Sequence, residues 1–165
     1  MTTWSQAFAA QAASDLSAYE FLAKKNLPVC HRLHYLQMWL EKLCKAYLWS
    51  IAEPPDDLLQ KHNVIAKVLP SIVVEHWRRV GLEKPPNLNL IRELCREIDL
   101  LQPQIRDGNR RPDNSEYPWL GDSGEIEVPA RWRFPVADRL YTNPGKLLIR
   151  AAERFTRSPA LFADR

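Results

Sequence analysis

The sequence predicts an all-α fold, an up-and-down helical bundle that carries an irregular C-terminal strap and a final helix. Apolar residues recur at spacings of three and four along several segments, which is the period of an amphipathic helix. Thirteen prolines fall mostly between these segments, where proline starts or stops helices. One long stretch has no helical period. We therefore expect a single domain over 1–165, with a bundle over 1–106, the strap over 107–137 and a final helix over 138–157.

The first two helices are predicted over 5–25 and 28–51. The first presents one apolar face, formed by Phe8, Ala12, Leu16, Tyr19 and Leu22. The second begins near Pro28, which suits a first helical turn. Its apolar stripe of leucines is widened by Trp39, Cys44 and Leu48, so it is expected to be central and contacted on two sides.

Two more helices are predicted over 58–79 and 89–105. Asp56 or Asp57 is the expected N-cap of the third helix, and Gly81 suits its end. Pro70 lies inside this segment, so either the helix kinks there or two helices meet there.

The strap contains the segment RRPDNSEYPW, residues 110–119, and then GEIEVPARWRF, which alternates weakly and favours a short hairpin or an extended segment. Beyond it, NPGKLLIRAAERFTRS predicts the final helix. Its inward face is expected to carry Leu148, Ala151, Ala152 and Phe155. The opposite side carries a basic stripe of Lys146, Arg150, Arg154 and Arg157.

The composition favours a cytoplasmic globular protein. The N-terminus lacks the pattern of a signal peptide, and the run VIAKVLPSIVV is too short to span a membrane. Cys30, Cys44 and Cys95 have no metal-ligand spacing and are expected to be buried thiols. The net charge of +3 permits a phosphate-bearing partner without requiring one.

The segment LEKLCKAYLWSIAEPPDDLLQKHNVIAKVL resembles the core of HEPN domains, helical bundles of prokaryotic toxin, RNase and nucleotide-binding systems. The family's Glu-Lys-x-x-Lys-Ala-x-Leu pattern is matched by Glu41, Lys42, Lys45, Ala46 and Leu48. His62 and Asn63 match a His and amide that follow in that family. Glu116, Tyr117 and Pro118 resemble its Arg-Tyr-Pro, with Glu in place of Arg. The resemblance covers about the first hundred residues and implies a bacterial protein that forms a homodimer.

The sequence departs from the RNase members of that family. Those carry an Arg four to six residues before a His, and none of His31, His34, His62 and His76 has an Arg at that distance. We therefore interpret the chain as a non-catalytic HEPN-like binding or adaptor protein that recognises a nucleotide, RNA or a protein partner encoded nearby. The alternative is a divergent HEPN ribonuclease or toxin that uses His62 with Arg110 or Arg111.

Candidate ligand-binding or phosphate-binding residues are Lys42, Lys45, Arg110, Arg111, Tyr117 and Trp119. The two lysines lie three apart on one helix and could clamp phosphate, or they could form an ordinary solvated face. The arginines and aromatic residues suit a nucleotide, but they also suit a strap whose aromatics anchor in the bundle. We favour the strap, because the local acids nearly balance the local bases. His31 and His34 could pair on a metal, although no third ligand is evident. No metal and no cofactor are expected, because no matching motif is present.

Overall fold

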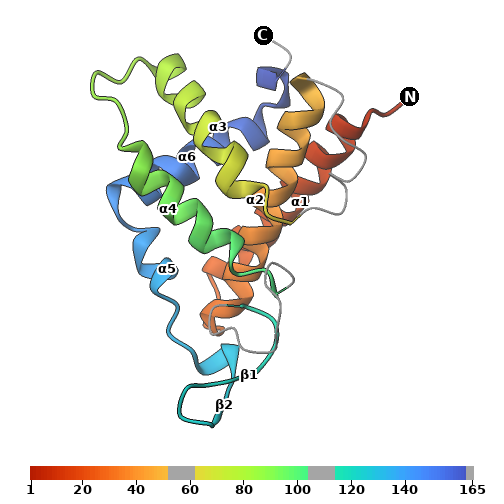
Figure 1. The fold of residues 1–165 in the computed structure, drawn as a ribbon. Coiled ribbons are helices and arrows are strands. Elements are labelled where there is room, and N and C mark those ends of the chain that lie inside the picture. The colour runs from red at the N-terminus through yellow and green to blue at the C-terminus, as the bar shows by residue number, and fades with distance from the viewer. Residues whose placement is uncertain (52–61, 104–113, 163–165) are drawn as a thin grey trace.

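A computed structural model describes residues 1–51, 62–103 and 114–162 of the chain, and these form a mostly helical structure. Within them lie six α-helices and one small hairpin (Figure 1). The helices are α1 (Trp4–Ala23), α2 (Val29–Ile51), α3 (Ile65–Val80), α4 (Leu88–Asp99), α5 (Pro135–Arg139) and α6 (Asn143–Arg157). The helical fold class is thereby confirmed. Asp56, Asp57, Arg110 and Arg111 lie outside the described residues.

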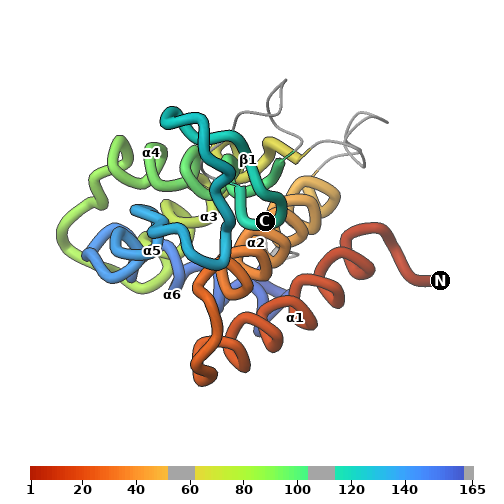
Figure 2. The backbone as a smooth tube through the Cα atoms, turned by 90° about the horizontal axis from the view of Figure 1, so that it is seen from below, coloured from red at the N-terminus to blue at the C-terminus, as the bar shows by residue number. Residues whose placement is uncertain are grey.

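The first two helices form an antiparallel pair, visible from below in Figure 2. Helix α1 begins with a capping box, in which Thr3 Oγ1 accepts from Gln6 N and Gln6 Oε1 accepts from Thr3 N. At the same end of the pair, Ser5 Oγ donates to the carbonyl of Ala46, 2.9 Å away. Apolar residues along α2 are buried, from Leu33 to Tyr47, so its predicted central position is confirmed.

Helix α3 begins at Ile65, so the predicted helix over 58–79 is wrong for residues 62–64. No side chain adjacent in sequence caps it. Instead the Asp99 carboxylate, at the end of α4, accepts from the backbone N–H groups of Ile65 and Ala66. Pro70 lies within one continuous helix, and Gly81 ends it in the left-handed conformation, as predicted.

Helix α4 begins after an Asn87 N-cap and ends at Asp99, earlier than the predicted residue 105. The chain leaves the helix through tight turns, with Gln102 N donating to the Asp99 carbonyl. Pro103 follows, and a residue that precedes proline disfavours helical backbone. The strap then returns to this point, because Ser115 N donates to the carbonyl of Leu101 at 3.1 Å.

The strap forms a hairpin of β1 (Trp119–Leu120) and β2 (Ile126–Glu127), with Trp119 opposite Glu127, and then a 3₁₀ turn at Pro129–Arg131 that contacts α2. The segment NPGKLLIRAAERFTRS forms α6 as predicted, but the bounds 138–157 start too early, because the chain forms α5 and then breaks before α6. The break has a local cause, because Thr142 caps α6 and Pro144 suits its first turn.

One cluster of buried side chains runs from α1 to α6. Helix α6 contributes Leu148, Ala151, Ala152 and Phe155, which are all buried as predicted. Trp39 of α2 is also buried, and its indole N–H donates to Thr156 Oγ1 at 2.7 Å. None of the described helices has the length and apolar character that a membrane span requires.

Candidate functional site

A buried polar network lies on α2 around Glu41, which is only 5% exposed. Its Oε1 accepts from Lys45 Nζ at 2.8 Å, and its Oε2 accepts from Gln37 Nε2 at 2.8 Å. His62 Nδ1 lies 3.3 Å from the same Oε2. Lys45 was predicted to bind phosphate, but it is 3% exposed and its charge is paired inside the protein.

Lys42 is paired in the same way, across the interface of the first two helices. Its Nζ lies 2.9 Å from Asp15 Oδ2, and Asp15 Oδ1 accepts from Gln11 Nε2 at 3.1 Å. Because ion pairs with buried carboxylates satisfy both lysines, the geometry gives their predicted phosphate-binding role no support. The Lys42–Asp15 pair joins α1 to α2, whereas the Lys45–Glu41 pair lies within α2.

His62 is the residue that the ribonuclease alternative requires. Its side chain is 32% exposed, and its Nδ1 faces the Glu41 carboxylate. A carboxylate in this position fixes the orientation and tautomer of an imidazole. The proposed partners Arg110 and Arg111 lie outside the described residues, so the alternative stays a prediction.

The other histidine pair does not converge on a metal. His31 is exposed, whereas His34 Nδ1 lies 3.3 Å from Glu116 Oε1 in the strap. No group of three possible metal ligands occurs in residues 1–51, 62–103 and 114–162. Glu116 therefore links the strap to α2.

The three cysteines are buried free thiols, as predicted. Burial raises the pKa of the Cys30, Cys44 and Cys95 thiols, with Cys44 also raised by nearby anionic groups. A thiol with a raised pKa is a poor nucleophile at neutral pH. These residues therefore contribute to packing.

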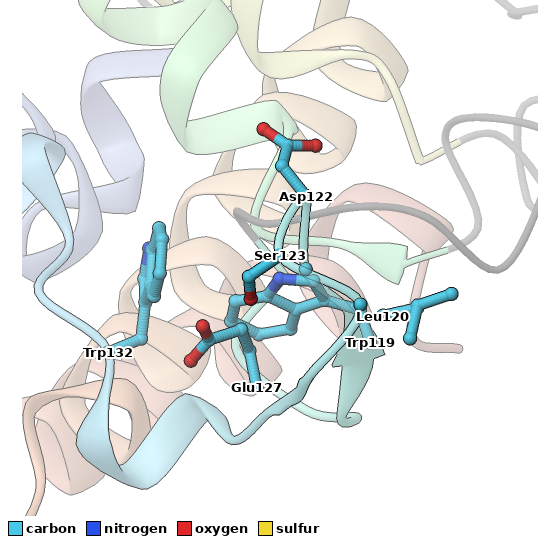
Figure 3. Close-up of a pocket in the computed structure, with 8 residues that line it drawn as sticks. Trp119, Leu120, Asp122, Ser123, Glu127 and Trp132 are labelled. Atoms are coloured by element: carbon cyan, nitrogen blue, oxygen red, sulfur yellow. The ribbon is translucent and has the colours of Figure 1, made fainter.

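The two aromatic residues predicted as stacking surfaces have different environments. Tyr117 is 61% exposed, whereas Trp119 is 4% exposed and meets Trp132 edge to face, with ring centroids 5.3 Å apart. Asn114 Oδ1 accepts from the backbone N–H groups of Glu116 and Tyr117, which fixes the turn before β1. The strap thus anchors one ring and exposes the other, and Figure 3 shows the anchored ring beside a cavity.

A second cavity, which we name the α6 cleft, collects basic and aromatic side chains from three helices and one loop. It measures about 290 Å³ and is lined by Tyr19, Arg32, Leu140, Tyr141, Lys146, Ile149, Arg150 and Glu153. The Arg32 guanidinium donates from Nη1 to the Tyr141 hydroxyl, 3.3 Å away. Its Nε is buried and has no hydrogen-bond partner among the described residues.

The electrostatics of the α6 cleft favour an anion. Among the described residues, three cations, Arg32, Lys146 and Arg150, line it against one carboxylate, Glu153, whose pKa burial raises. Behind α6, burial and then the charges of Arg154 and Arg150 lower the pKa of His76. Burial also raises the pKa of the Tyr19 phenol, which keeps it a neutral donor.

The sequence identified only half of this cleft. The basic stripe of the final helix contains Lys146 and Arg150, but nothing in the local pattern connected them with Arg32. Not every cation of this basic stripe is free to bind an anion, because Arg157 forms an ion pair with Glu20 of α1.

No protein-family model matches this chain, and neither does any curated protein or solved structure with which it was compared.

Proposed function

We propose that this chain is a non-catalytic binding protein for a phosphate-bearing ligand, a nucleotide or RNA, and that the α6 cleft holds the phosphate. The observation that carries this proposal is the convergence of Arg32, Lys146 and Arg150 on one cavity. These side chains come from α2 and α6, so the fold brings three cations together against the Coulomb repulsion between them. A bound anion would relieve that repulsion.

The donor geometry supports phosphate in particular. Arginine presents several N–H donors in a planar fork that matches phosphate oxygens. The unpartnered Nε of Arg32 leaves one such donor unused within the described structure. Tyr19 and Tyr141 supply hydroxyl donors and ring surfaces in the same cleft, on which a base or ribose could rest.

The test is a binding titration by fluorescence anisotropy, with labelled single-stranded RNA and with a labelled adenine nucleotide, over a series of salt concentrations. If three cations contact phosphates of the RNA, the logarithm of the binding constant falls with the logarithm of salt at a slope of about −2. Arg32→Ala and Arg150→Ala should each weaken binding about tenfold and make that slope shallower.

Arg96→Ala is the matched control, because Arg96 is an exposed arginine of α4 outside the cleft. Equal losses in Arg96→Ala and Arg150→Ala would show diffuse charge attraction and reject the cleft. An absence of binding at low salt by folded protein would reject the proposal altogether.

A HEPN-like origin is part of this proposal. Glu41, Lys45 and His62, which carry much of the resemblance, contact one another in the buried network. These motif positions are separated in sequence but meet in one structural network, and this supports a relationship to that family. The bacterial source is an expectation from the resemblance, and the cytoplasmic location is an expectation from the composition.

The expected homodimer receives no support from α2. An exposed apolar part of this helix would support a dimer surface, but its wide apolar stripe is largely buried within the chain. Light scattering coupled to size-exclusion chromatography tests the dimer directly. An adaptor role with a protein partner encoded nearby is tested by co-purification of the two chains.

The ribonuclease alternative keeps one favourable observation, the contact of half-exposed His62 with a buried carboxylate. An imidazole held in this way can act as a general base. The assay is RNA cleavage without added metal, comparing the wild type with His62→Ala. His31→Ala is the control, since His31 is an exposed histidine of α2. Cleavage that His62→Ala alone removes would replace the binding proposal with an enzyme.

A further inference from the structure

The hairpin of the strap encloses a cavity that the phosphate-binding proposal does not use. This hairpin cavity measures about 500 Å³ and lies beside Trp119 and Trp132 (Figure 3). Its rim is the β1–β2 loop, from Gly121 to Gly124, and Glu127 of β2 completes the lining.

Two tryptophan rings form the aromatic wall of the hairpin cavity. Trp119 and Trp132 meet at an interplanar angle of 86°, so the edge of one ring faces the other ring. Trp119 is 96% buried, being 4% exposed, and neither indole N–H has a hydrogen-bond partner among the described residues. Buried indole N–H groups usually find an acceptor, so these two donors are unsatisfied in the described structure.

The charge of this cavity is opposite to that of the α6 cleft. Asp122 and Glu127 line it, and no lysine or arginine does so among the described residues. Arg133, which follows Trp132 in sequence, is paired with Asp138 at 3.0 Å. Phosphate would meet repulsion here, whereas a cation would be attracted by the carboxylates and by the electron-rich ring faces.

The Glu127 side chain lies against Gly121, two residues beyond its strand partner Trp119. A Cβ on Gly121 would approach Glu127 Cγ to 3.0 Å and Glu127 Oε1 to 3.3 Å, so the carboxylate arm lies across this glycine. In Figure 3 the Glu127 carboxylate points toward the space between the two rings, whereas Asp122 points away from it. Glu127 is therefore the nearer counter-charge for a ligand against the indoles.

We infer that the hairpin cavity binds a compact alkylated ammonium ion that also carries an oxygen atom able to accept a hydrogen bond. The methyl groups of such a cation bury against the Trp119 and Trp132 rings. Glu127 balances its charge, and a free indole N–H donates to its oxygen. A free small molecule and a methylated lysine of a partner protein share this chemistry. The inference does not depend on the α6 cleft.

The experiment compares two ligands of the same shape by isothermal titration calorimetry on the full chain. Choline carries the trimethylammonium group, and 3,3-dimethylbutan-1-ol replaces its nitrogen with carbon. Choline should bind at least about tenfold more tightly. A third ligand, N-acetyl-trimethyllysine methylamide, distinguishes the sources, because tighter binding than choline identifies a methylated protein and weaker binding identifies a small metabolite.

Two variants of the hairpin complete the test. Glu127→Gln should weaken choline binding about tenfold, whereas Glu125→Gln should not change it, because Glu125 lies on the same loop but does not line the cavity. Thermal unfolding confirms that both variants fold. In ¹⁵N spectra of the wild type, choline should shift the indole N–H signals that Trp119→Phe and Trp132→Phe remove.

Three results would overturn the inference. The first is no saturable choline binding by folded protein. The second is equal affinity for choline and its uncharged analogue, and the third is equal loss of affinity in Glu127→Gln and Glu125→Gln.

Discussion

Replacement of Asp99 by asparagine should change how the stability of this protein depends on pH. The Asp99 carboxylate is 5% exposed and accepts from the N–H groups of Ile65 at 3.2 Å and Ala66 at 2.9 Å. It caps α3 from the end of α4, so one side chain connects two helices that are far apart in sequence. Asparagine is nearly the same shape and is itself a good N-cap, so the variant should fold.

The magnitude follows from the environment of this carboxyl. Burial raises the pKa of Asp99 from 3.8 to about 6, against the two backbone hydrogen bonds, which lower it. A raised pKa means that folded protein binds more protons than unfolded protein between these two values. The free energy of unfolding therefore falls as pH rises from 4 to 6, by about 3 kcal/mol for this group.

The assay is urea unfolding of the wild type and Asp99→Asn at several pH values between 4 and 7.5. The difference between the two proteins cancels the titration of groups that both retain. Asp99→Asn should gain about 3 kcal/mol relative to the wild type as pH rises through this range, because it loses only the titration. Its altered hydrogen bonds add an offset that does not vary with pH.

A difference that stays constant from pH 4 to 7.5 would refute this reasoning, as would a change of the opposite sign. The opposite sign would mean that the two N–H donors and the helix N-terminus outweigh burial and stabilise the carboxylate.

Three further substitutions test the packing and the polar network, each by urea unfolding. Thr156→Val removes the acceptor of the buried Trp39 indole N–H and should cost about 2 kcal/mol, whereas a cost near zero would show that the indole finds another acceptor. Lys45→Met leaves the Glu41 carboxylate buried without its ammonium partner and should cost about 3 kcal/mol. The double variant Lys45→Met with Glu41→Gln should regain much of that loss, and additive losses would contradict the pairing. Gly145→Ala places a methyl group against the backbone of the α5–α6 connection and should lower the free energy of unfolding by about 2 kcal/mol. An unchanged free energy of unfolding would show that this connection can move to accommodate the methyl group.

Much of the helical structure could be predicted because its causes are local. The apolar period of the final helix identified Leu148, Ala151 and Phe155, which are buried. The left-handed end of α3 at Gly81 is also a property of a few adjacent residues. Where the predictions were wrong, a local signal was missing or was misread. The third helix starts at Ile65 because its cap comes from Asp99, 34 residues later in the chain.

The candidate sites could be predicted only in part. The pattern around Lys42 and Lys45 indicated two cations on one helix, but a pattern within one helix does not reveal a carboxylate that another helix brings to it. Likewise RRPDNSEYPW indicated either a stacking surface or a strap with anchored aromatics, yet it could not show that Trp119 packs against Trp132 while Tyr117 stays exposed.

By itself, then, the sequence determined the helical class, most helix positions, the central place of α2 and the buried face of α6. These depend on side-chain periodicity and capping within a few turns of one chain segment. Only the tertiary structure decided which charges are paired and which converge on a cavity. Arg32 and Tyr141 are 109 residues apart, and they meet because α2 and the start of α6 pack in one core. Electrostatic interactions depend on distance in space, so their partners are fixed only when the helices are packed.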